Sequence, residues 1–218
     1  MTVETNRRGG IRERLRTEVR DEVKRIALRQ LADGGPQALS VNAIAKELGV
    51  SGPALYRYFK GKDDLLTELV LDAYGDLAEA VEAATRSRKP AQRLAAFARA
   101  YRGWAIAEPH RYRLLYARPT PGYDAHRQSL VDAAQRLMVL LLDVLTSAPG
   151  PAGKGVPNAL AGQLTAWGRK RELDVDPEVA HRAIVVWSRL HGLVSLEIEG
   201  NFASMGVDGE LLLDTELG

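Results

Sequence analysis

The sequence contains no cysteine in 218 residues. Without thiols the chain cannot form disulfides, thiolate zinc sites or iron–sulfur clusters, and it cannot sense redox state through a thiol. This absence fits a reducing compartment. The longest unbroken apolar run is the six residues Leu137 to Leu142, far short of the roughly 20 residues that a membrane helix needs. The polar N-terminus lacks the apolar core of a signal peptide, so we expect a cytoplasmic protein without a membrane partner.

Motifs of common enzyme classes are also missing. Residues 148–155 only faintly resemble a phosphate-binding loop, because Ala148 stands where the first glycine belongs and Gly155 where a Mg²⁺-binding hydroxyl belongs. The four histidines, at positions 110, 126, 181 and 191, include no pair at metal-binding i, i+4 spacing. No Gly-x-Ser-x-Gly motif occurs. We expect no catalytic residue, metal or cofactor, and a helical small-molecule enzyme is the alternative from another class.

Positive charge is concentrated at the start of the chain. Residues 1–62 hold 13 Lys and Arg against 7 Asp and Glu, whereas residues 63–218 hold 17 against 21. The formal net charge of the whole chain is only +2. A basic first segment joined to an acidic remainder favours a polyanionic partner for the first segment alone. The other interpretation is that these charges merely keep a helix in contact with water.

Apolar residues recur at helical spacing along most of the chain, and no segment alternates convincingly like a strand. We therefore predict an all-α protein with nine helices, three in a head of residues 1–62 and six in a body of residues 63–218. The polar residues 1–10 are predicted to form a flexible basic arm. The longer helices are expected near 12–32, 63–84, 126–145, 158–171 and 177–199, with a weak tail at 200–218.

Residues 40–62 are the stretch around which the rest is organised. Ser40 and Ser51 are suited to N-cap two short helices, because a hydroxyl accepts a hydrogen bond from a free backbone N–H group. Gly49 lies between them and favours the left-handed turn that ends the first helix. Leu55 and Phe59 lie one turn apart and are expected to point inward. A short helix, a glycine turn and a second helix with a polar outer face indicate a helix-turn-helix.

The run from Gly49 to Leu66, Gly-Val-Ser-Gly-Pro-Ala-Leu-Tyr-Arg-Tyr-Phe-Lys-Gly-Lys-Asp-Asp-Leu-Leu, resembles the DNA-binding signature of TetR-family transcriptional regulators. Trp187, His191 and Gly192 resemble the Trp-x-x-x-His-Gly signature of one TetR C-terminal domain type. The resemblance implies a dimeric repressor that a small apolar or aromatic effector releases from a near-palindromic operator in double-stranded DNA. An activator or a ligand-independent DNA-binding protein is the alternative.

The resemblance and the helix-turn-helix geometry imply the same DNA-reading surface. The helix beginning at Gly52 should enter the major groove, with Ala54 close to a thymine methyl group. Arg57 would contact either a guanine or a phosphate, and Asn42 matches a family position suited to adenine. Because few side chains here read bases by hydrogen bonds, DNA shape would carry part of the specificity.

Other residues of this surface are assigned to DNA phosphates. Tyr56 and Lys62 match phosphate-binding positions of the family, as do the helix starts at Ser40 and Ser51. For the tyrosines, the alternative is that they are simply aromatic residues packed at the surface. The complete predicted DNA-binding set is Ser40, Asn42, Ser51, Gly52, Pro53, Ala54, Tyr56, Arg57, Tyr58 and Lys62.

Two further sets of residues concern the body. An apolar effector cavity would be lined by Phe97, Tyr101, Trp104, Tyr112, Tyr116, Met138 and Trp167. Aromatic residues at this spacing are more often ordinary core, so packing is the favoured alternative at each position. The family resemblance places a dimer interface at Leu164, Trp187, Ser188, His191, Gly192 and Ser195. The small residues at 188, 192 and 195 share one helical face, which would let a neighbouring helix approach closely.

Overall fold

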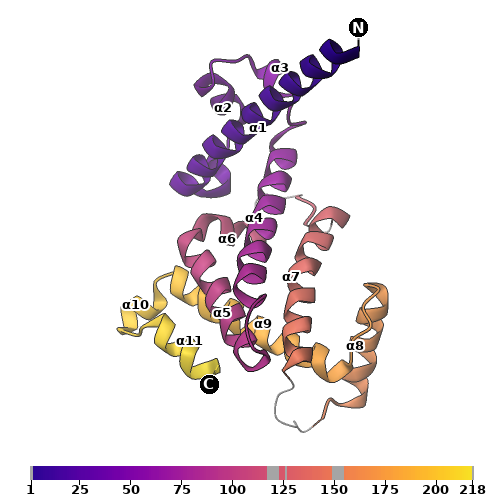
Figure 1. Cartoon of the computed structure of the whole chain (residues 1–218). Coiled ribbons are helices and arrows are strands. Elements are labelled where there is room, and N and C mark those ends of the chain that lie inside the picture. The colour runs from indigo at the N-terminus through magenta and orange to yellow at the C-terminus, as the bar shows by residue number, and fades with distance from the viewer. Residues whose placement is uncertain (1, 117–122, 126, 149–154, 218) are drawn as a thin grey trace. The chain divides into compact units, whose positions relative to one another are not determined.

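The computed structural model describes residues 2–116, 123–125, 127–148 and 155–217 (Figure 1). Within these ranges every regular element is a helix, which confirms the all-α prediction. The chain divides into two compact units. Unit 1 comprises the residues up to 73 together with 110–130, and unit 2 comprises residues 74–109 with 131–218. The division falls inside helix α4 (Lys62–Thr85), and the boundary between a DNA-binding head at 1–62 and a body at 63–218 stays a prediction.

Unit 1 begins with helix α1, which spans Thr2–Ala38 and has non-helical torsions at Gly34 and Gly35. The glycines therefore interrupt the helix where a stop was predicted, and Pro36 begins a final turn whose missing N–H group costs little. Residues 2–10, predicted to be a flexible arm, belong to α1 in the structure. Internal glycines cost a helix only about 1 kcal/mol each relative to alanine, so a pair of them need not end it.

The core of unit 1 forms where α1 packs with helices α2 (Val41–Glu47), α3 (Gly52–Leu55) and the first half of α4. Helix α6 (Pro109–Tyr116) continues into this unit from residue 110. The most deeply buried members of this core are Val23, Ile26, Ala27, Ile44, Ala45, Leu55, Phe59, Leu65, Leu66 and Leu69. Leu31 of α1 is also buried, but Leu15 is 54% exposed and lies outside the core.

Unit 2 is built from the second half of α4 and six further helices. These are α5 (Pro90–Ala107), α7 (Gln128–Ser147), α8 (Asn158–Lys170), α9 (Pro177–Ile198), α10 (Asn201–Met205) and α11 (Gly209–Leu217). No helix of the described ranges carries an apolar stretch long enough to cross a membrane.

The last two helices correct the prediction of a weak tail after residue 200. Gly200 and Gly206 adopt positive φ angles of 77° and 68°, which allow the sharp turns before and after α10. Asp208 then caps α11, because its Oδ1 accepts hydrogen bonds from the backbone N–H groups of Glu210 at 2.8 Å and Leu211 at 3.1 Å. The described residues therefore contain eleven helices instead of the nine expected.

Candidate DNA-binding site

The two serines act as the helix caps that the sequence predicted. The Ser40 Oγ accepts a hydrogen bond from the Ala43 N–H group, and the Ser51 Oγ accepts one from the Ala54 N–H group, each at 3.3 Å. Gly49 has a φ of 67°, so the turn between α2 and α3 is left-handed at the residue that tolerates it best. These local contacts set where each helix of the motif begins and let the chain turn between them.

The second helix of the motif is shorter than predicted. Helix α3 ends at Leu55, and the chain continues through Phe59 in tight helical turns. In these turns the N–H groups of Tyr58 and Phe59 both donate to the Leu55 carbonyl oxygen, at 2.9 and 3.2 Å. Leu55 and Phe59 are each 1% exposed, so the inward face is as predicted. The opposite face of this segment is left for a partner.

The predicted DNA-contacting residues differ in their exposure. Six of them are exposed, namely Ser40, Asn42, Ser51, Pro53, Tyr56 and Arg57, and the other four, Gly52, Ala54, Tyr58 and Lys62, are half-buried. The structure also brings Asn42 of α2 next to the first turn of α3. A Cβ atom added at Gly52 would lie 3.5 Å from the Asn42 Oδ1 atom, in ordinary van der Waals contact. Asn42 therefore belongs to the same surface as α3.

Sequence reasoning missed Arg20, which braces the recognition segment from α1. Its guanidinium donates a 2.7 Å hydrogen bond to the Tyr58 carbonyl oxygen, pairs with Glu68 of α4, and lies 4.6 Å from the centre of the Phe59 ring. A guanidinium suits all three contacts, because it is planar and has five donors. The arginine thus ties the end of the recognition segment to two long helices.

Other polar contacts support the same unit. The Lys24 ammonium lies 2.8 Å from the Asp72 carboxylate. Burial lowers the pKa of Lys24, but the contacts with Asp72 and Asp21 outweigh it, so the pKa is raised. The Gln30 Oε1 atom accepts a 2.9 Å hydrogen bond from the Ser40 N–H group, which connects α1 directly to the start of α2. These contacts connect α1 to α2 and to α4 within unit 1.

The aromatic residues predicted for an effector cavity have mixed environments. Phe97 and Tyr101 are buried and stack with ring centres 6.4 Å apart, and Tyr112 is 2% exposed. Trp104, Tyr116, Met138 and Trp167 are half-buried. The buried members serve the core, which was the favoured alternative, and their contact with an effector stays a prediction.

The predicted dimer residues lie mainly on α9. The Trp187 and His191 rings stack with centres 6.3 Å apart, and burial lowers the pKa of His191. Ser188 is exposed, Ser195 is half-buried, and a Cβ atom added at Gly192 would meet nothing within 4 Å. Leu164 of α8 is buried. The α9 face around Gly192 therefore has open space, and its contact with a second subunit stays a prediction.

Comparisons with known proteins agree with this geometry. Residues 25–69 match the model of bacterial regulatory proteins of the tetR family, and residues 94–218 match the tetracyclin repressor-like C-terminal domain. The HTH-type transcriptional regulator Rv1816 of Mycobacterium tuberculosis is 32% identical, over 96% of this chain and 93% of that protein. A C-terminal domain of the specific Trp-x-x-x-His-Gly type stays a prediction.

Solved structures have the same fold. The regulatory protein SCO4313 superposes with a TM-score of 0.81 at 42% identity, over 94% of this chain and 96% of that one. The regulator FadR of Bacillus subtilis, solved in complex with stearoyl-CoA, has a TM-score of 0.61 at 17% identity, over 90% and 94%. At that identity the second likeness concerns the fold alone. The matched families and relatives are regulators rather than enzymes, and within the described residues no His, Asp and Glu cluster could hold a metal. With family models matching both parts of the chain and relatives matched over almost its whole length, the protein belongs to the TetR family and is a DNA-binding transcriptional regulator.

Proposed function

We propose that this regulator is a dimeric repressor, released from a near-palindromic operator by a small apolar or aromatic effector in the cytoplasm. Residues 1–62 would bind the DNA, and residues 63–218 would bind the effector and dimerise. The observation that carries the proposal is the Ser51-capped segment, which buries Leu55 and Phe59 and leaves Pro53 and Arg57 exposed. A rigid segment with one polar outer face fits a major groove, which is wide enough for one helix.

Within this surface, Asn42 and Ala54 are the proposed base-facing residues. Asn42 lies beside Gly52, two residues before Ala54, which supports contacts of both residues with neighbouring base pairs. The phosphate contacts are assigned to Tyr56 and Lys62, at the far end of the segment. Two such heads would occupy successive major grooves, about 34–36 Å apart along the operator.

A mobility-shift experiment with the DNA upstream of the gene tests the binding. Lys62→Ala should weaken binding to all sequences about equally and lower the slope of affinity against salt by about 1, because one phosphate contact is lost. A changed sequence preference would show that Lys62 is no phosphate ligand. We expect Arg57→Ala to give the same uniform loss, whereas relaxed specificity at one base pair would assign Arg57 to a guanine.

The dimer is tested at Gly192. The open space at this residue and the small side chains at 188 and 195 support close approach of the partner subunit's helix. Gly192→Leu should leave a folded monomer by light scattering and circular dichroism, and operator affinity should collapse, since one head alone has no fixed spacing. A folded variant that remains a normal dimer would contradict the interface.

Effector release is the last part of the proposal. A small apolar or aromatic compound that abolishes the shift must bind the released form better than the DNA-bound form. A shift that resists every effector would favour the ligand-independent alternative. Higher transcription in the presence of the protein would favour an activator.

A further inference from the structure

An apolar groove in unit 2 has no role in the function described so far. It lies among α5, α9, α10 and α11 and has a volume of about 410 Å³, within the range of about 300–1,000 Å³ typical of small-molecule pockets. Leu94, Leu193, Phe202 and Leu212 each contribute a wall from a different one of these helices. None of the seven residues predicted for the effector cavity lines this groove.

The lining of the groove includes one pair of opposite charges. Arg189 of α9 and Glu216 of α11 lie at its lining, with 3.8 Å between the Arg189 Nη1 and Glu216 Oε2 atoms. Their side chains are 69% and 53% exposed, and an ion pair this open to water contributes little. A carboxylate on a bound molecule could therefore replace Glu216 and form two parallel hydrogen bonds with the guanidinium.

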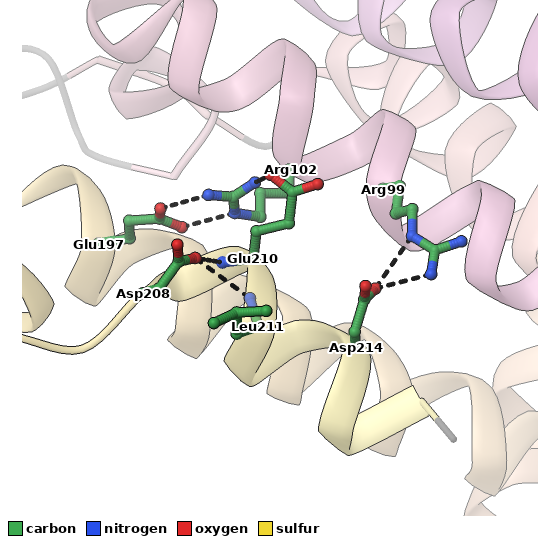
Figure 2. Close-up of polar contacts among 7 residues, drawn as sticks. All are labelled: Arg99, Arg102, Glu197, Asp208, Glu210, Leu211 and Asp214. Carbon is green, nitrogen blue, oxygen red and sulfur yellow. Dashed lines mark hydrogen bonds and ion pairs between the residues drawn. The ribbon is translucent and has the colours of Figure 1, made fainter.

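Polar contacts outside the groove fix its α11 wall (Figure 2). Arg102 of α5 donates to both carboxylate oxygens of Glu197, at 2.6 and 2.8 Å, and contacts Glu210 of α11 at 3.4 Å. Arg99 lies 2.8 Å from the Asp214 carboxylate, one turn further along α11. These pairs and the buried Leu213 hold α11 in place, so the groove is present in the chain without a ligand.

We propose that this groove binds a small amphipathic acid, with the apolar body between α9 and α11 and the carboxylate at Arg189. The leucine and phenylalanine side chains of the lining supply the affinity, since they remove the apolar part of the ligand from water. The single guanidinium supplies the preference for an acid over a neutral molecule. The proposal concerns binding alone and stands whether or not the groove controls release from DNA.

The test is calorimetric titration of the full-length protein with dodecanoate, and with dodecanol as the neutral match. Dodecanoate should bind more tightly than dodecanol. Leu193→Trp should abolish binding of both, because the indole fills the groove. Leu211→Trp is the matched control, since Leu211 lies on α11, is 68% exposed and is not part of the lining. Arg189→Ala should weaken dodecanoate by up to about fivefold, the size of a water-exposed ion pair, and leave dodecanol unchanged.

A second blocking variant keeps the test decisive if Leu193→Trp fails to fold. Leu196→Glu places a negative charge in the groove at a residue that is already 47% exposed, so the fold should tolerate it while dodecanoate is repelled. Binding that survives both variants would overturn the proposal and place the ligand elsewhere, for example among the aromatic residues. Equal losses for acid and alcohol in Arg189→Ala would overturn the acid preference. A folded Leu193→Trp protein that becomes monomeric would show that the groove is covered by a second copy of the chain instead.

Discussion

Each compact unit uses an arginine of a long helix to hold a later part of the chain, but the partners differ in kind. In unit 1, Arg20 holds the backbone carbonyl of Tyr58 and the face of the Phe59 ring as well as a carboxylate. In unit 2, the hydrogen bonds and ion pairs described for Arg102 all go to carboxylates, those of Glu197 and Glu210.

This difference has a physical consequence. A contact to a carbonyl oxygen and a ring fixes the path of the backbone, which a DNA-reading segment needs. A contact to carboxylates fixes the position of whole helices and depends on charge. The hydrogen bonds that Arg102 donates to Glu197 outweigh burial and raise the pKa of Arg102, so this arginine stays charged. We expect the unit 1 contact to matter chiefly for function and the unit 2 contact chiefly for stability.

The largest effect is expected from Arg102→Ala. The Arg102 and Glu197 side chains are each only 17% exposed, and the change leaves Glu197, Glu210 and nearby Asp208 without their shared cation. We expect a loss of about 3 kcal/mol in the free energy of unfolding, the lower end for breaking a buried pair. Hydrogen exchange should show faster opening of residues 201–217. Arg99→Ala is the control: its pair with Asp214 is about half exposed, so less than about 1 kcal/mol should be lost.

A smaller loss of stability, with a larger loss of function, is expected from Arg20→Ala. The contacts to a carbonyl and a ring together should contribute about 2 kcal/mol. The mobility shift should nevertheless be strongly reduced, because the recognition segment loses its fixed path. Arg20→Lys should recover little of the shift, since an ammonium cannot reach all three partners. Lys24→Ala removes a neighbouring ion pair without touching the segment; if it were equally damaging to the shift, Arg20 would have no special role.

The smallest effect is a change of stability with pH, and it comes from His191 of α9 instead of from either arginine. Burial lowers the pKa of His191 below its ordinary value of 6.5. Below that value the unfolded chain binds a proton at His191 more readily than the folded chain, so stability should fall as the pH drops through about 6.5. Urea unfolding at pH 7.5 and pH 5.5 should show this loss, and His191→Gln should make it smaller. If the variant retained the full pH dependence, His191 would not be its source.

The helix-turn-helix could be predicted because its signals are local. Ser40, Ser51 and Gly49 act on backbone groups within a few residues, and the burial of Leu55 and Phe59 follows from helical spacing. Arg20 could not be predicted in the same way, since it reaches Tyr58 across 38 residues and its neighbours in sequence do not distinguish it from the other basic residues of α1.

The C-terminal helices and their groove were missed for a similar reason. Residues 200–217 are too short and too weakly patterned to predict two helices alone. Their stability comes from tertiary contacts, chiefly the buried Leu213 and the arginines of α5. The aromatic residues predicted for the effector cavity have a clear helical pattern, but that pattern has two meanings. Helical spacing cannot distinguish a core tyrosine from one that faces a ligand.

The brace at Arg20 also makes this regulator suitable for retargeting by protein engineering. Its contacts are to a main-chain oxygen, a buried ring and a carboxylate of α4, none of which belongs to the exposed side chains proposed to read bases. Asn42, Pro53, Ala54 and Arg57 can therefore be randomised in a library while the scaffold beneath them is kept. Selection for new operators would then vary the side chains that face the DNA major groove while every library member keeps the same fold.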